Sequence, residues 1–181
     1  MNRKLVDLSR FMSLVLRHKP EDIGLMLDGE GWADLDELIA KARAHGQPLD
    51  RDLVTRIVAE SDKQRFALSA DGRHIRANQG HSVEVDLALP ELQPPPELYH
   101  GTAVQNLDSI RASGLNAGSR RHVHLSPNAE TAVRVGARHG KPIVLTIDSD
   151  AMYRAQHKFY RSDNGVWLTG SVPMPFIRFP V

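Results

Sequence analysis

The chain has 181 residues, enough for one large or two small domains, and 41% of them are hydrophobic, so we expect a folded core rather than disorder. It has no cysteine, which excludes disulfides, thiolate nucleophiles and cysteine-based zinc sites and suits a reducing compartment. The first 90 residues carry 13 Lys and Arg against 15 Asp and Glu, and the rest carry 10 against 7. Neither half is basic enough to bind nucleic acid through bulk charge, so phosphate recognition would need a few well-placed arginines.

The N-terminal half is predicted to hold three helices and a hairpin. Apolar residues recur at helical spacing over 5–16. Asp34 and Glu37 have the spacing of a capping box for a second helix, and Asp50 starts a third. The segment 65–77 alternates as two strands around an Asp-Gly turn. Three helices followed by a hairpin predict a winged-helix arrangement, which does not by itself settle function.

The stretch LPELQPPPEL, residues 89–98, is the clearest break in the chain, because its four prolines favour an extended spacer. We therefore predict two domains, 1–92 and 93–181. After the break, ELYHGT, HVHLS, KPIVLTID and NGVWLTG have the pattern of short strands, with helical NLDSIRASG and AETAVRVGARHG between them. The predicted fold class is α+β. Rossmann and Walker A motifs are both absent from the sequence.

Charged and imidazole side chains gather in SRRHVHLS, residues 119–126. On a strand, His122 and His124 point to the same face, as a metal-binding pair would. However, Arg120 and Arg121 would repel a cation, and no carboxylate lies nearby in the sequence. A strand that faces an anion explains the arginines better than a metal site does.

Two shorter motifs contain residue types suited to chemistry. Arg17 and His18 end the first predicted helix, where basic side chains stabilise the helix dipole. His100-Gly101-Thr102 ends a predicted strand, where a glycine lets a ligand approach the backbone closely. For each motif alone, an ordinary structural role is the better explanation.

Taken together, these motifs resemble those of the RNA 2′-phosphotransferase family, the enzymes that remove a splice-junction 2′-phosphate from tRNA using NAD. The motifs follow one another along nearly the whole chain as Arg17-His18, Arg65, Gly80-His81-Ser82, His100-Gly101-Thr102, Gly114-Leu115, Arg120-x-His122-Val123-His124-Leu125-Ser126 and Asn164 to Leu168. The resemblance implies an N-terminal winged-helix lobe that binds RNA and a C-terminal lobe similar to ADP-ribosyltransferases that binds NAD.

The resemblance also implies which residues act. The family's Arg-His-Arg-Arg tetrad carries over to Arg17, His18, Arg65 and Arg120, with Arg121 as the alternative for the last position. The implied contacts with NAD come from His100, Gly101, Thr102, Gly114, Leu115, His124 and Ser126.

The implied reaction has two steps and needs no metal. Many ADP-ribosyltransferases use a glutamate where Val166 stands here, but a 2′-phosphate is already anionic and needs positioning and charge neutralisation rather than a base. Its attack on the NAD ribose releases nicotinamide and leaves 2′-phospho-ADP-ribosylated RNA. Attack of the ribose O2″ on phosphorus then frees RNA with a 2′-OH and ADP-ribose 1″,2″-cyclic phosphate, and His18 assists the proton movement.

The expected protein is a cytoplasmic monomer that acts on tRNA-like RNA. The N-terminus lacks the apolar block of a signal peptide, and no apolar run approaches the length of a membrane helix. One rival function is mono-ADP-ribosylation of other phosphorylated nucleic-acid ends or of protein. Another is a non-enzymatic winged-helix regulator, which would need a basic recognition helix, whereas residues 49–61 are nearly neutral.

Overall fold

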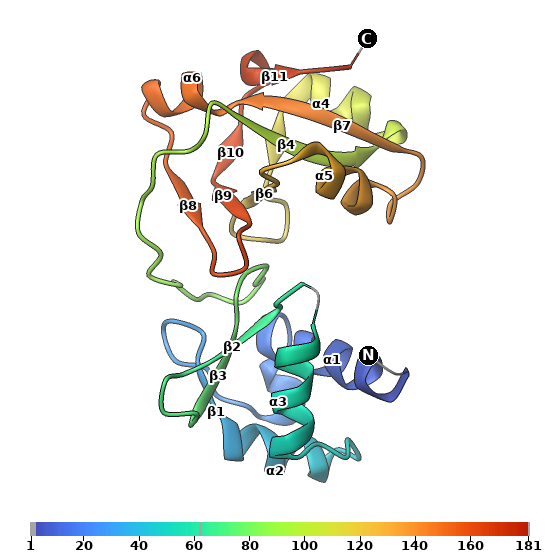
Figure 1. Ribbon diagram of the computed structural model, residues 1–181, viewed down its shortest axis with the longest axis vertical. Coiled ribbons are helices and arrows are strands. Elements are labelled where there is room, and N and C mark those ends of the chain that lie inside the picture. The colour runs from blue at the N-terminus through green and yellow to red at the C-terminus, as the bar shows by residue number, and fades with distance from the viewer. Residues whose placement is uncertain (1–2, 62, 181) are drawn as a thin grey trace. The chain divides into compact units, whose positions relative to one another are not determined.

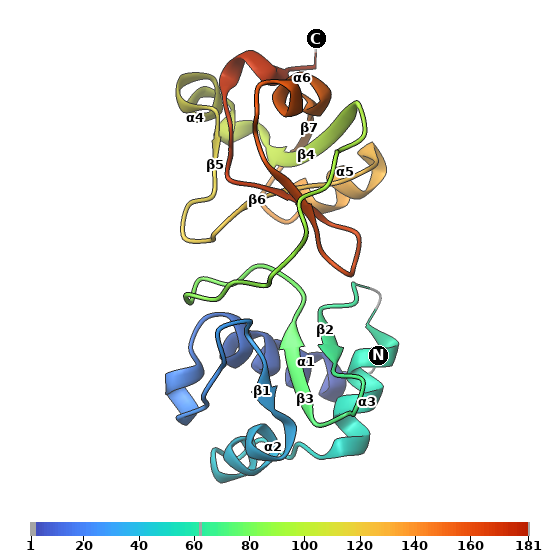
Figure 2. The same ribbon diagram turned by 90° about the vertical axis from the view of Figure 1, so that its left-hand side faces the viewer.

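The computed structural model describes residues 3–61 and 63–180, and the chain divides into two compact units, Met1–Ala88 and Leu89–Val181. Each unit has a hydrophobic cluster of its own. Figures 1 and 2 show the helices and strands of the two units from two directions.

The first unit contains the three predicted helices. They are α1 (Arg3–Arg17), α2 (Leu35–Ala44) and α3 (Arg51–Glu60), with a short 3-10 helix, η1 (Pro20–Ile23), after α1. The predicted caps are confirmed, because the Asp34 side chain accepts from the Glu37 amide and the Asp50 side chain accepts from the Leu53 amide. Each cap satisfies a backbone N–H that the first turn of a helix leaves without a partner.

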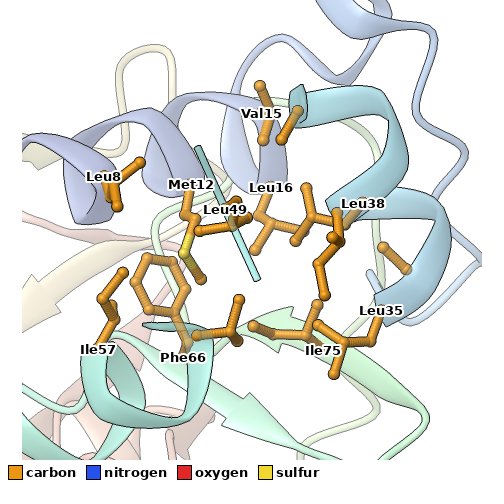
Figure 3. Packing of buried hydrophobic residues seen from close by; sticks show 14 of the residues in the cluster. Leu8, Met12, Val15, Leu16, Leu35, Leu38, Leu49, Ile57, Phe66 and Ile75 are labelled. Carbon is orange, nitrogen blue, oxygen red and sulfur yellow. The ribbon is translucent and has the colours of Figure 1, made fainter. Parts of the chain in front are cut away.

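The predicted hairpin is also confirmed. Strand β2 (Phe66–Leu68) pairs antiparallel with β3 (His74–Ala77), and the short strand β1 (Ala33–Asp34) adds to the other edge of β3. Gly72 has a φ of +68° in the turn, as the Asp-Gly pair indicates. Side chains from all three helices and from β2 and β3 meet in one core, which includes Leu16, Phe66 and Ile75 (Figure 3).

The second unit is built on two three-stranded antiparallel sheets. In one sheet β4 (Glu97–Ala103) pairs with β7 (Pro142–Asp148), and β11 (Ile177–Arg178) pairs with the other edge of β7. In the other sheet β9 (Trp167–Thr169) lies between β6 (Val123–Leu125) and β8 (Phe159–Arg161). A backbone bridge between Tyr99 and Ser126 joins β4 to the chain just after β6.

Shorter elements complete this unit. Strand β5 (Leu115–Asn116) pairs with β10 (Ser171–Val172). Helix α5 (Ala129–Gly136) contacts β4 and β7, while α4 (Leu107–Ser113) and α6 (Ser149–Arg154) connect strands, and the 3-10 turns are η2 (Val104–Asn106) and η3 (Met174–Phe176). The proline-rich stretch is hydrogen-bonded to this unit, since the Ser149 hydroxyl donates to the Pro95 carbonyl and the Leu92 amide to the Phe159 carbonyl.

Helices and antiparallel strands are thus both present, and every strand pair of the described residues is antiparallel, which agrees with the α+β class. In the second unit, the sequence pattern predicted strands β4, β6, β7 and β9 but not β5, β8, β10, β11 or helix α6. Among the described residues, no helix is long and apolar enough to cross a membrane.

Candidate active-site residues

Three residues of the predicted tetrad lie together in the first unit. Arg17 ends α1, and its Nη2 donates to the backbone carbonyl of Arg65 at 3.2 Å. The Arg17 guanidinium also lies 5.9 Å from the centre of the Phe66 ring. The end of α1 is therefore attached to the start of β2, although the two are far apart in the sequence.

Both His18 and Arg65 line a cavity of about 580 Å³ that lies wholly within this unit. His18 is exposed and Arg65 is half-buried. A guanidinium carries permanent positive charge and several N–H donors, which suits a phosphate group. An imidazole beside it can take up or release a proton near neutral pH. The pair is equipped to hold an anion and to move a proton at it.

Ser82 fixes the His18 ring, a contact to which the sequence analysis gave no role. The His18 Nδ1 lies 2.9 Å from the Ser82 hydroxyl oxygen. The amides of Ser82 and Val83 both donate to the Arg17 carbonyl, at 2.9 and 3.3 Å, so this segment covers the C-terminus of α1. Only the family motif Gly80-His81-Ser82 signalled this segment in advance.

A second group of predicted residues meets in the other unit. The Tyr99–Ser126 bridge, with N–O distances of 2.8 and 2.9 Å, brings the motif His100-Gly101-Thr102 beside the β6 strand. The His100 Nδ1 lies 3.1 Å from the His124 carbonyl oxygen. Since a carbonyl can only accept, Nδ1 carries the proton and Nε2 of the neutral ring is an acceptor.

Burial lowers the pKa of His100 below its ordinary value of 6.5, the His139 charge acts in the same direction, and the hydrogen bond to the His124 carbonyl opposes the shift. The ring is therefore neutral at neutral pH. It combines a fixed Nδ1–H donor with an Nε2 lone pair, which is the arrangement for accepting a hydrogen bond from a hydroxyl group.

The His100 shift predicts a pH dependence of stability. Below pH 6.5, His100 binds a proton in the unfolded chain but not in the folded protein. The free energy of unfolding should therefore fall as the pH drops from 6.5 toward the lower pKa of folded His100. His100→Asn keeps a donor near the Nδ1 position and cannot titrate. Urea unfolding of both proteins between about pH 5 and 7.5 should show the wild type losing more stability toward the acid end. Parallel curves would contradict the shift.

Arg120 lies against His124. Its Nη1 is 3.3 Å from the His124 Nδ1, and because a guanidinium only donates, that ring nitrogen is the acceptor. Val123 and Leu125 are buried, while His122 and His124 are half-buried on the alternate positions, as predicted for a strand. His122 packs edge-on against Tyr160, with ring centres 5.6 Å apart. In the part of the chain that the structure describes, no group of three or more potential ligands could hold a metal ion.

Gly101 has a packing role as well, and its predicted contact with a ligand stays a prediction. A Cβ at this position would lie 1.7 Å from the Ala132 carbonyl oxygen, and one at Gly136 would lie 2.6 Å from the Thr102 carbonyl oxygen. Two glycines thus let α5 pack directly on the β4 backbone. Thr102 is buried, and its Oγ1 accepts from the side-chain Nδ2 of Asn106 at 3.1 Å. The space at Gly101 is filled by α5, so a ligand could contact only its backbone.

Gly114 and Leu115 lie at the end of α4, in a different segment of the chain from the other predicted site residues. Gly114 is the C-cap of α4 with a φ of +71°, and a Cβ there would lie 2.4 Å from the Val172 carbonyl oxygen. Leu115 is a buried core residue. Gly114 therefore ends α4, and cofactor contact at these residues stays a prediction.

Comparisons with known proteins agree with the motifs. Residues 3–171 match the family described as "RNA 2'-phosphotransferase, Tpt1 / KptA family". A protein of Pseudomonas paraeruginosa named "Probable RNA 2'-phosphotransferase" is 57% identical over 180 residues, covering 98% of this chain and 99% of its own. Proteins with the same name from Agrobacterium fabrum and Streptomyces coelicolor are 56% and 52% identical, covering 93% and 98% of this chain and 91% and 96% of their own.

Proposed function

Because the chain belongs to the RNA 2′-phosphotransferase family, we propose that it removes a 2′-phosphate from RNA with NAD as the co-substrate. That it is a transferase of this family follows from the match over residues 3–171 and from relatives that are more than half identical along nearly the whole chain. The use of NAD, the roles of the residues and the nature of each unit are the proposal.

The observation that carries the proposal is that His18 and Arg65 line one cavity of the first unit, while the Arg17 guanidinium is hydrogen-bonded to the Arg65 carbonyl. Arg65 would bind the 2′-phosphate and neutralise its charge, and the Arg17 guanidinium would act beside it. His18, oriented by Ser82 through Nδ1, would supply a proton to the RNA 2′-oxygen when that oxygen leaves.

The second unit has groups that fit NAD. The neutral His100 ring offers an Nε2 acceptor to a ribose hydroxyl. Arg120, the fourth residue of the proposed catalytic tetrad, lies beside His124 and offers positive charge to the reacting 2′-phosphate. The remaining proposed contacts come from Gly101, Thr102, Gly114, Leu115, His124 and Ser126. Holding the ribose in one orientation toward the incoming phosphate would convert a two-molecule encounter into a positioned reaction.

The proposed reaction has two steps. A 2′-phosphate oxygen bonds to C1″ of the NAD ribose as nicotinamide leaves. The ribose O2″ then loses its proton and bonds to phosphorus, while the RNA O2′ leaves and takes up a proton. The products are RNA with a 2′-OH and ADP-ribose 1″,2″-cyclic phosphate. Acceptors other than an RNA 2′-phosphate are not favoured, because the Arg17-His18 pair would have no part in a protein acceptor's reaction.

We also propose that residues 1–92 form a winged-helix RNA-binding lobe and residues 93–181 an ADP-ribosyltransferase-like lobe. In support, the first unit has the order α1, β1, α2, α3, β2, β3 with β3 at the centre of the sheet. The assignment of the second lobe is supported by its two three-stranded sheets, which are joined at the Tyr99–Ser126 bridge that holds His100 beside β6.

Activity should depend on NAD and not on a metal. RNA bearing one internal 2′-phosphate should lose it only when NAD is added, and one nicotinamide should be released for each phosphate removed. A chelator should leave the rate unchanged, since guanidinium groups supply the positive charge in this proposal. Phosphate removal without NAD, or its loss in the chelator, would contradict the proposal.

A further inference from the structure

The cavity that His18 and Arg65 line extends well beyond those two residues. Its other wall residues come from one face of α1 and from the connection between α3 and β2, and they are Val6, Ser9, Arg10, Ser13, Leu14, Glu60 and Lys63. The α1 residues recur every three or four positions, so they form a continuous stripe along the helix. His18, which directly follows α1, is at the C-terminal end of this stripe.

The stripe is long enough for more than one nucleotide. Arg10 precedes the end of α1 at Arg17 by seven residues, which is about 10 Å along the helix axis. Stacked nucleotides of one strand rise about 3.4 Å each, so Arg10 is roughly three nucleotides away from a phosphate held near the helix end.

The charges along the cavity suit a polyanion. Arg10, Lys63 and Arg65 are cationic, and Glu60 is the one carboxylate among the wall residues that the structure describes. Glu60 accepts from the Arg56 guanidinium at 3.2 Å, so its charge is compensated by a residue outside the wall. Arg10 contacts Asp7 at 3.4 Å, but its side chain remains 78% exposed and can reach a ligand.

Polar and apolar groups lie between these charges. Ser9 is only 3% exposed, and its Oγ has no hydrogen-bond partner among the residues that the structure describes. A buried hydroxyl without a partner needs an explanation, and its place in the cavity wall makes a hydrogen bond to a ligand one such explanation. Leu14 is a large apolar side chain that is 40% exposed on the same stripe, where a base or sugar could cover it.

We infer that this cavity is the binding track for the RNA strand on one side of the reactive 2′-phosphate. Arg10 and Lys63 contact backbone phosphates two to four nucleotides away, Ser9 and Ser13 offer hydroxyls to the strand, and Leu14 packs against a base or sugar. Phosphate contacts carry no base information, so the track selects single-stranded RNA of sufficient length and not a sequence. The inference rests on the proposed function.

A substrate-length series tests the track. The substrates are a dinucleotide with a 2′-phosphate at its junction and RNAs extended from it by five nucleotides on the 5′ side or the 3′ side. The quantity measured is the length advantage, which is kcat/KM for an extended RNA divided by kcat/KM for the dinucleotide. For the wild type we expect an advantage of about tenfold or more for one direction of extension, decreasing as salt is added.

Charge reversal at Arg10 should remove that advantage. Arg10→Glu should reduce it about tenfold, since a repulsive contact replaces an attractive one at a backbone phosphate. Lys4→Glu is the matched control, because Lys4 is an exposed residue of the same helix outside the cavity wall, and it should keep the wild-type advantage. Circular dichroism checks that both variants are folded, and Arg10→Gln should give an intermediate value.

Three results would overturn the inference: no length advantage in the wild type, an advantage that Arg10→Glu leaves intact, or an equal loss in Lys4→Glu. A wild-type protein that converts neither the dinucleotide nor the extended RNAs in the presence of NAD would instead overturn the proposed function. The dinucleotide reaction therefore separates the failure of the track from the failure of the function.

Discussion

Replacing Arg65 with alanine should make 2′-phospho-ADP-ribosylated RNA accumulate, because the second step should slow more than the first. Arg65 lines the cavity with His18 and is proposed to hold the phosphate as charge develops during attack on phosphorus. Losing one charge-assisted contact in that transition state should cost about 3 kcal/mol, or roughly a hundredfold in rate. The first step can use Arg120 and the phosphate's own nucleophilicity, so it should be less affected.

The intermediate is measured as a slower-migrating band on a denaturing gel during single-turnover reactions. His18→Ala should accumulate it as well, if His18 protonates the leaving 2′-oxygen. His100→Ala should slow the first step and show no intermediate. Arg73→Ala is the control for Arg65, since Arg73 is an exposed residue in the turn of the same hairpin. The role assignment fails if Arg65→Ala and His18→Ala both lose activity with only unreacted RNA present.

Gly101→Ala should destabilise the second unit severely. The added Cβ would lie 1.7 Å from the Ala132 carbonyl oxygen and 2.5 Å from the carbonyl carbon, both backbone atoms. No rotamer change relieves a clash between two backbones, so β4 and α5 must separate. Overpacking typically costs about 1–3 kcal/mol, and we expect the upper end of this range or more here.

Thermal unfolding measures this effect, and a cost of about 3 kcal/mol should lower Tm by roughly 6–12 °C. Gly170→Ala is the matched control in the same unit, because a Cβ at Gly170 has no heavy atom within 4 Å and its φ is not in the left-handed region. Gly170→Ala should change Tm little. Equal Tm values for the two variants would show that α5 does not pack on β4 as described.

Elements whose signals are local in sequence could be predicted. The Asp34 and Asp50 caps are contacts with the next turn, and the Asp71-Gly72 turn needs only its own residues. Helix α6 has six residues, which is too few to show a clear helical period. The β8 strand exists because it pairs with β9, and this pairing is a tertiary contact.

The candidate site, too, could be predicted only in part. Its residue types were visible as motifs, but their partners were not. The His100–His124 hydrogen bond depends on the bridge between Tyr99 and Ser126, which no periodicity encodes. The packing of α5 on Gly101 could not be predicted, because the backbone that fills its side-chain space is 31 residues further along, at Ala132. The Ser82–His18 contact likewise joins segments that only the fold brings together.

The most direct test of the proposed mechanism follows the phosphorus atom. RNA carrying one 32P-labelled internal 2′-phosphate is incubated with the protein and NAD, and the labelled products are separated and identified by mass. We expect the label to leave the RNA in ADP-ribose 1″,2″-cyclic phosphate, with an equal amount of nicotinamide released. Label recovered as inorganic phosphate, with NAD unconsumed, would mean simple hydrolysis and would rule out transfer of the phosphate to NAD.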